Sequence, residues 1–185
     1  MKVGIISVVI AVGLALALSL PVLASQNSTI TITMTGLNEI SISLDKTEWP
    51  LGTIASNTVY ETVPPIEWCT LTIAGTCNVK TFIVGDDAEW VGHPGAYQWT
   101  LSDDGTNGQH IYGLWFRVSG DTSRGPLGDG YVPVTKTETD LWPPSGEPSL
   151  TPGDKKQFGL RLLSPTYFYS SRQMQTQIII GAVIA

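Results

Sequence analysis

Beyond residue 24 the chain alternates apolar and polar residues and nowhere shows the spacing of an amphipathic helix. No window of helical length places apolar side chains at positions i, i+3, i+4 and i+7. The clearest alternation is the segment 28–35, which reads STITITMT. Threonine and isoleucine are both β-branched and favour extended backbone. Because turn signals follow each alternating segment, the pattern predicts an all-β protein.

The number and spacing of these segments indicate one domain over residues 25–185. About nine or ten short strands suit a single β-sandwich of jelly-roll or immunoglobulin-like type, in which two sheets share one core. The expected strands are residues 28–35, 40–44, 58–63, 68–73, 78–84, 97–101, 111–118, 131–136, 157–163 and 176–184.

The first 24 residues have the features of an export signal. Lys2 precedes an uncharged apolar run, Pro21 breaks it, and Val22 and Ala24 stand at the two positions that a signal peptidase reads. We therefore expect residues 1–24 to be a cleaved signal peptide and the remaining chain to be secreted or held at the cell surface. An uncleaved anchor is the alternative, since the run is long enough to cross a bilayer. After cleavage we expect no stable membrane span.

Two cysteines, Cys69 and Cys77, lie in the exported part of the chain. In an oxidising compartment two thiols are more often joined than free, so we expect a disulfide between them. The intervening residues alternate and end in Ala74-Gly75-Thr76, so the bond would close a hairpin between adjacent strands. Their spacing is not that of a metal site, and no metal or cofactor is expected.

Charge and motif content exclude several functional classes. Ten Lys and Arg stand against sixteen Asp and Glu, which gives no electrostatic basis for binding nucleic acid. The sequence has no G-x-S-x-G motif, and His93 and His110 fall in expected loops without a recognisable catalytic partner. We expect a protein that is not an enzyme.

Calcium is the one ion that the turn residues bring into question. Carboxylate and amide oxygens on two turns are ligands that Ca²⁺ accepts. Ordinary hairpin turns explain the same residues, and the full calcium-loop spacing is not met, so calcium is kept only as the weaker alternative. The candidates are Asp86, Asp87, Asp103, Asp104 and Asn107.

Six tryptophans are many for a domain of this size. Trp68, Trp99 and Trp115 fall in expected strands, where we predict that they fill the space between the sheets. Trp49, Trp90 and Trp142 fall in expected loops, beside Tyr97 or Tyr131. This second set either packs against the domain or forms an exposed platform for a sugar or a protein partner.

Residues 71–87, with the sequence LTIAGTCNVKTFIVGDD, resemble the strand-turn-strand of secreted prokaryotic surface sandwiches. With the signal peptide and the last strand, the layout is similar to that of the TasA and camelysin group of fibre proteins. Trp99-Thr100-Leu101 also supplies the W-x-L of WxL-type surface proteins, although the second W-x-L of those proteins is missing here. The resemblance implies a structural role in the cell envelope or outside the cell.

Two functional hypotheses remain. In the first, the protein is a non-enzymatic structural or adhesive subunit that binds copies of itself or other envelope proteins. Its N-terminal segment, residues 28–35, would insert at an open sheet edge of a neighbouring copy. In the second, it is a carbohydrate-binding module whose loop aromatics, Trp49, Trp90 and Trp142, stack on glycans.

Overall fold

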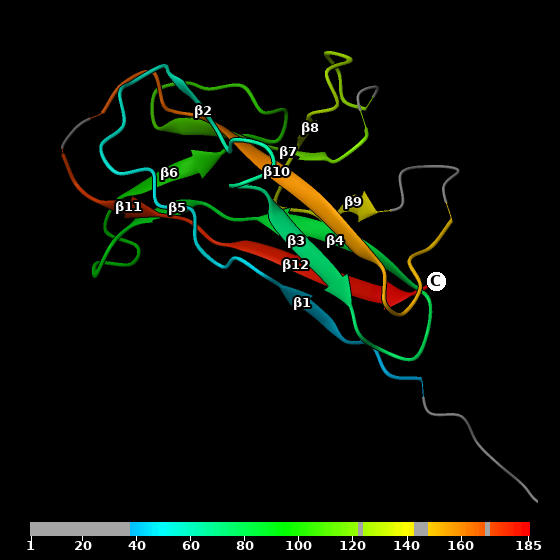
Figure 1. Cartoon of the computed structure of the whole chain (residues 1–185). Helices are drawn as coiled ribbons and strands as arrows, with labels where there is room; N and C mark the ends of the chain where they lie inside the picture. The colour runs from blue at the N-terminus through cyan, green and yellow to red at the C-terminus, as the bar shows by residue number, and fades with distance from the viewer. Residues whose placement is uncertain (1–37, 122–123, 143–147, 169–170) are drawn as a thin grey trace, which may run out of the picture. The chain divides into compact units, whose positions relative to one another are not determined.

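The computed structural model describes residues 38–121, 124–142, 148–168 and 171–185. Within these ranges the chain forms twelve strands and no helix, which confirms the all-β prediction (Figure 1). Consequently, no helix there has the length and apolar character needed to cross a bilayer. The strands are β1 (Ile42–Leu44), β2 (Val59–Glu61), β3 (Cys69–Ile73), β4 (Val79–Gly85), β5 (Ala88–Trp90), β6 (Gln98–Leu101), β7 (Ile111–Val118), β8 (Val132–Pro133), β9 (Thr139–Trp142), β10 (Lys155–Leu163), β11 (Met174–Gln175) and β12 (Ile178–Ile184).

Nine strands form the larger sheet, whose main path is β1-β3-β10-β7-β6-β5-β11. β2 also pairs with β10, and β8 with β7. The longest strand, β10, is central: Phe158 lies opposite Cys69 on one side and Val118 on the other. All pairings are antiparallel except that of β6 with β7, in which Thr100 lies opposite Ile111.

A bent two-stranded ribbon connects the larger sheet with a second sheet of order β12-β4-β9. Only Asp86 and Asp87 separate β4 from β5, and only two residues separate β11 from β12. β5 pairs with β11 and β4 with β12, so the ribbon runs through both sheets. At the bend the Tyr112 hydroxyl lies 2.5 Å from the Asp86 carbonyl oxygen and 2.8 Å from the Thr176 hydroxyl.

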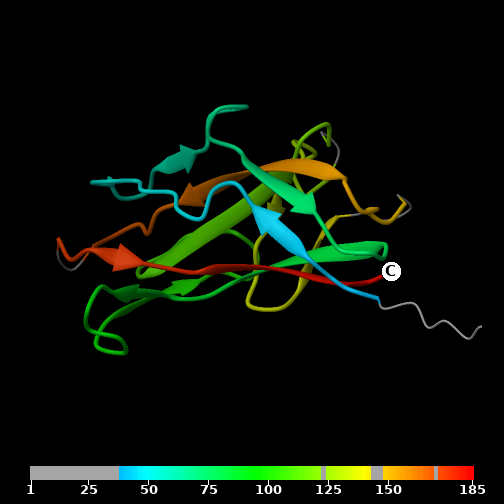
Figure 2. The ribbon, with the colours of Figure 1, turned by 60° about the horizontal axis from the view of Figure 1, so that its bottom comes forward.

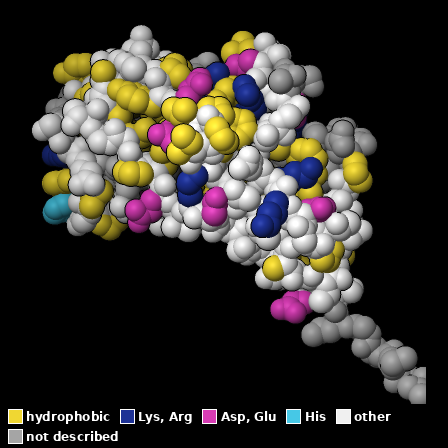
Figure 3. Space-filling view, in the orientation of Figure 1, with side chains coloured by type: hydrophobic (Ala, Val, Ile, Leu, Met, Phe, Trp, Pro, Cys, Tyr) yellow, Lys and Arg dark blue, Asp and Glu magenta, His cyan; other side chains and the backbone are white. Residues whose placement is uncertain are grey.

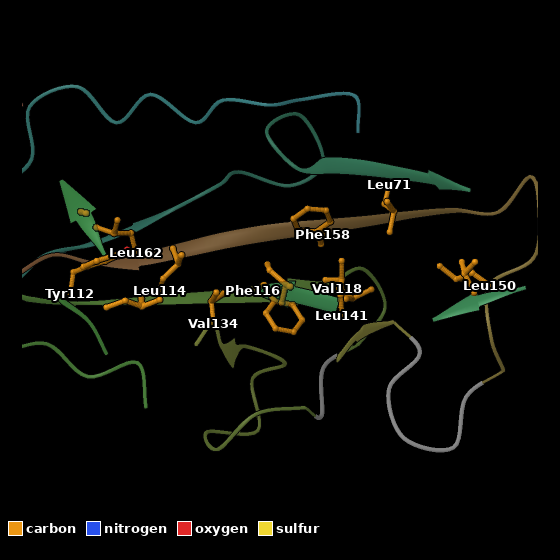
Figure 4. Close-up of a cluster of buried hydrophobic side chains, with 14 of the residues drawn as sticks. Leu71, Tyr112, Leu114, Phe116, Val118, Val134, Leu141, Leu150, Phe158 and Leu162 are labelled. Carbon is orange, nitrogen blue, oxygen red and sulfur yellow. The ribbon is translucent and has the colours of Figure 1, made fainter. Parts of the chain in front are cut away.

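The ribbon in Figure 2 shows how the strands of the two sheets are arranged, and one hydrophobic cluster lies between the sheets (Figure 4). The inner face of the larger sheet contributes Phe158 and Leu162 from β10 and Phe116 from β7, and the smaller sheet contributes Ile83 and Leu141. All five side chains are buried. The alternation of buried and more exposed residues along β4 has the period of two that one covered face produces.

The three strand tryptophans are buried, as predicted, but only Trp99 belongs to the core between the sheets. Trp115 alternates with the core residues of β7 and lies beneath Gly105, whose carbonyl accepts a hydrogen bond from its indole Nε1 at 3.1 Å. Trp68 packs over Gly159 on the same outer face, where a Cβ on the glycine would collide with the indole. The prediction that all three fill the space between the sheets is therefore wrong for two of them.

Nine of the ten expected strands overlap strands of the structure, and segment 28–35 lies outside the described residues, as do residues 1–24. The expectation missed β5, β9 and β11, which have two to four residues each. These strands are too short for their alternation to stand out from a loop. β5 and β11 extend the ribbon beyond its bend, and β9 pairs with β4 through a register shift at Thr81 and Phe82.

The predicted disulfide is wrong: Cys69 and Cys77 are both free thiols. The expected hairpin does not form, because β3 belongs to the larger sheet and β4 to the smaller one. The Cys69 thiol contacts the carbonyl of Lys46 at 3.4 Å, and that of Cys77 contacts the carbonyl of Glu39 at 3.5 Å. Glu39 and Lys46 flank β1 and are seven residues apart in extended backbone, which separates them by roughly 23 Å. The two cysteines, one beside each of these residues, are therefore far beyond the roughly 7 Å limit between bridged α-carbons.

Candidate functional site

The last strand, β12, is an open edge of the smaller sheet. It pairs antiparallel with β4 from Ile178 opposite Gly85 to Ile184 opposite Val79. Among the described residues no strand pairs with its other side. A sheet edge presents unpaired backbone N–H and C=O groups, which are a template for another strand.

The side chains of β12 make this edge unusually apolar. Ile179, Val183 and Ile184 are 59%, 47% and 52% exposed. Ile178 and Ile180, which alternate with Ile179, pack against the core. The run of apolar residues on both faces is typical of a strand that is covered on both sides. Within the described part of the chain, only one of its faces is covered.

A patch of apolar side chains extends from β12 onto the outer face of β4. Phe82 lies opposite Gly181, and a Cβ on Gly181 would collide with its ring. Phe82 and Val84 are half-buried and alternate with the fully buried residues of β4. No charged residue follows Arg172 in the sequence, so β12 itself lacks the charges with which proteins commonly prevent edge-to-edge pairing. The neighbouring strand β4 places one charge on this face, the exposed Lys80 opposite Val183. The face of the molecule in Figure 3 carries acidic and basic side chains among its hydrophobic ones.

The main path of the larger sheet has two edges: β11, which has only two residues, and β1, which is protected in the usual way. β1 has only three residues, and charged residues follow it directly. The Asp45 carboxylate accepts a hydrogen bond from the Thr70 amide at 2.6 Å, which lowers the pKa of that carboxyl. Lys46 donates to the carbonyl oxygens of Ile66 and Trp68, both at 2.6 Å. Short length and nearby charge make β1 a poor template compared with β12.

A second feature lies where β5 ends and β6 begins. We call it the aromatic rim, and it comprises Trp90, His93, Tyr97, His110 and Arg172. The His93 ring stacks on Trp90 with 3.8 Å between ring centroids. The Tyr97 hydroxyl lies 2.9 Å from His110 Nδ1. The Arg172 guanidinium carbon lies 4.3 Å from the Trp90 ring centroid and 5.3 Å from that of Tyr97. The rim therefore gathers both histidines of the chain around two aromatic rings and one cation.

The structure does not bring the three loop tryptophans together as one platform. Trp90 lies in β5 and contacts His93 and Arg172, whereas Trp142 lies in β9 with the Lys156 ammonium 4.0 Å from its ring centroid. Trp49 is half-buried and packs against the core. Of their expected neighbours, Tyr97 belongs to the aromatic rim and Tyr131 is buried.

Tyr131 is part of a cation–π arrangement that sequence pattern does not reveal. The guanidinium carbons of Arg161 and Arg117 lie 3.6 Å and 5.5 Å from its ring centroid, and that of Arg117 is also 5.4 Å from the centroid of Trp68. Arg161 forms ion pairs with Glu61 at 2.5 Å and with Asp129 at 2.9 Å. Burial raises the pKa of the Tyr131 hydroxyl, and the nearby Glu61 raises it further. This arrangement connects β2, β7 and β10 with the segment before β8.

The calcium candidates take part in local hydrogen bonds and ion pairs. Asp87 pairs with Lys136 at 2.7 Å and accepts a hydrogen bond from the Leu101 amide. Asp104 accepts hydrogen bonds from Ser102 and Thr106, which lower the pKa of its carboxyl to about 2. Two further candidates are engaged as well: the Asp86 side chain accepts from the Asp87 amide, and the Asn107 amide donates to Asn57 and Ser164. In the described ranges, which include Asp103, no group of three or more His, Cys, Asp or Glu is placed to hold a metal ion.

Comparison with known proteins gives no relative: no family model, curated protein or solved structure matches the chain.

Proposed function

We propose that the protein is a secreted or cell-surface structural subunit without enzymatic activity, whose copies assemble through β12. In this proposal residues 1–24 are the signal peptide, and residues 25–185 form one β-sandwich of jelly-roll or immunoglobulin-like type. The two sheets that share a core and the all-β content support the sandwich. The resemblance of residues 71–87 to prokaryotic surface sandwiches is in keeping with the proposed location.

The open apolar edge of β12 is the observation that carries this proposal. Pairing a second strand with β12 would satisfy its free backbone groups. Covering Ile179 and Val183, each about half exposed, would add roughly 1 kcal/mol per side chain. Long, uncharged edges are uncommon on proteins that remain monomeric, because they promote association.

The proposed occupant of this edge is the N-terminal segment of a neighbouring copy. Residues 28–35 alternate threonine with Ile30, Ile32 and Met34, which gives one apolar and one polar face. The segment has about the length of β12, whose seven residues pair over their whole length with β4. It carries no charge that would oppose burial beside Ile179 and Val183. Main-chain hydrogen bonds would supply affinity, and the alternating side chains would set the register.

The test is the molar mass of the exported chain by light scattering during size-exclusion chromatography, at several concentrations. We expect oligomers or fibres that grow with concentration. The double substitution Ile179→Lys, Val183→Lys should give monomers, because it puts two charges on the edge. The matched control Ile66→Lys adds a lysine at a position that is 79% exposed and outside any strand, and it should assemble normally.

Deletion of residues 25–35 identifies the occupant. Loss of assembly in this deletion supports the N-terminal strand, whereas assembly that survives it but not the β12 substitutions indicates pairing between two β12 strands. A wild-type protein that stays monomeric at high concentration would refute assembly through this edge.

Carbohydrate binding is the alternative function, and only the aromatic rim still supports it. Trp49 and Trp142 pack against the core, and Lys156 lies over the Trp142 ring. A titration of tryptophan fluorescence with a panel of polysaccharides separates this function from a purely structural one. No response to any glycan would remove it.

A further inference from the structure

The chemistry of the aromatic rim differs from that of a stacking platform for neutral sugars. His93 lies against the Trp90 ring at 3.8 Å, and Arg172 lies over the same side chain at 4.3 Å. A sugar that stacked on Trp90 would compete with both contacts. The rings therefore act as supports that fix the position of a cation and an imidazole.

Arg172 is the group that these supports position. Its guanidinium is exposed and contacts Trp90 and Tyr97, and it makes no hydrogen bond or ion pair with another residue of the described ranges. Stacking on aromatic faces leaves the N–H donors of a guanidinium free at its edge. Those donors form a planar fork that matches the two oxygens of a carboxylate.

The surroundings of Arg172 supply further polar groups and open space. His93 is exposed, and His110 and the Tyr97 hydroxyl are half-buried. Gly92 and Gly95 lie in the loop between β5 and β6, and a Cβ added to either glycine would meet no atom within 4 Å. A ligand bound to Arg172 could therefore extend over this loop with hydroxyl groups near His93.

We propose that the aromatic rim binds the carboxylate group of an acidic saccharide, with Arg172 as the main contact. A saccharide is favoured because sugar hydroxyls can hydrogen-bond with imidazole and phenol groups, which Arg172 has as neighbours. A nucleic acid is disfavoured because binding its phosphate backbone takes several cations, and among its described residues the rim has one arginine and no lysine. An acidic peptide that binds as an added strand is disfavoured, because β5 and β6 each have a neighbouring strand on both sides and the edge strand β11 has only two residues. This inference is independent of assembly through β12.

The test is calorimetric titration of the exported chain with oligogalacturonate, together with a neutral glucan of equal length, sulfated dextran and poly-glutamate. We expect saturable binding of oligogalacturonate and none of the neutral glucan. Arg172→Gln should weaken binding about tenfold or more, because it removes a charge-assisted bidentate contact. Arg172→Lys keeps the charge but loses the fork, and it should bind with intermediate affinity.

Two control variants separate the site from general charge and from misfolding. Lys155→Gln removes an exposed positive charge on β10, outside the rim, and should leave the affinity unchanged. Lys80→Gln removes an exposed positive charge on β4, also outside the rim, and should likewise leave the affinity unchanged. Circular dichroism should be the same for all variants.

Four results would overturn the proposal. These are no binding of oligogalacturonate, equal binding of the neutral glucan, tighter binding of sulfated dextran or poly-glutamate, and an Arg172→Gln affinity equal to that of the wild type.

Discussion

Replacing Tyr112 by phenylalanine tests whether one hydroxyl group holds the bend of the ribbon that connects the two sheets. Tyr112 is 1% exposed, and its hydroxyl contacts the Asp86 carbonyl at 2.5 Å and the Thr176 hydroxyl at 2.8 Å. The Thr176 hydroxyl lies 2.8 Å from the same carbonyl. The three groups form a closed triangle, so removing the phenol oxygen leaves Asp86 with one partner and Thr176 with one fewer.

The expected cost is the sum of the net contributions of these hydrogen bonds. At about 0.5–1.5 kcal/mol for each of the two bonds, Tyr112→Phe should lower the free energy of unfolding by about 1–3 kcal/mol. With a urea dependence of about 2 kcal/mol per molar, the unfolding midpoint should fall by roughly 0.5–1.5 M. Burial raises the pKa of Tyr112, so the phenol stays protonated and the effect should be the same from pH 6 to pH 9.

Two companion variants make this measurement specific. Tyr60→Phe removes a hydroxyl that accepts one hydrogen bond from the exposed Ala55 amide at 2.7 Å, and it should cost less than about 0.5 kcal/mol. Thr176→Val, combined with Tyr112→Phe, should show a coupling energy above about 0.5 kcal/mol. A Tyr112→Phe protein as stable as the wild type would refute the role of this hydroxyl at the bend.

Three further predictions concern the cysteines, a turn and a glycine. Unfolded, unreduced protein should give two free thiols, and one disulfide per chain would contradict the structure. In the native state Cys69 should be alkylated more slowly than Cys77, because burial raises the pKa of the Cys69 thiol. Asp104→Asn should lower the free energy of unfolding at neutral pH, because hydrogen bonds lower the folded pKa of Asp104 from 3.8 to about 2. This contribution is full above about pH 5, so the difference between wild type and variant in urea titrations should fade as the pH falls toward about 2. Gly159→Ala should lower the free energy of unfolding by about 1–3 kcal/mol, because the new methyl group collides with the Trp68 indole and the Thr62 hydroxyl. An unchanged melting temperature would show that Trp68 can move aside.

Much of the strand content follows from local pattern alone. β7 and β4 are predictable because both are rich in β-branched or aromatic residues and both lie between turn residues. β5 and β11 are not, since two or three residues carry no measurable period, and they are strands only because they prolong β4 and β12 beyond the bend. Their existence depends on long-range pairing, which short-range propensity does not encode.

The sheet to which each strand belongs is also outside the reach of local pattern. The turn at Gly75 suggests a hairpin between β3 and β4, but the residues after it cross to the other sheet. Gly75 lies so close to the Glu39 carbonyl that a Cβ there would collide with it, so β1 and its flanks occupy the place expected for β4. The wrong disulfide prediction follows from this single misassigned neighbour.

In the candidate sites, too, local sequence pattern predicts some features, and only the pairing of the strands reveals the others. The run Ile178-Ile179-Ile180 is recognisable as a strand, but its exposed edge can be seen only once its neighbours are known. The sequence points to Trp90 and Tyr97 but gives no signal for Arg172, since that residue lies more than seventy positions away and approaches Trp90 through the pairing of β11 with β5.

The concentration dependence of amide hydrogen exchange at β12 tests the central proposal most directly. If copies assemble through this edge, amides in Ile178–Ile184 that face away from β4 should exchange more slowly as protein concentration rises, while amides of β1 should not change. Residues 28–35 should gain protection over the same concentration range if they are the strand that binds. Exchange at β12 that is independent of concentration, in a sample that light scattering shows to be assembled, would contradict the proposal.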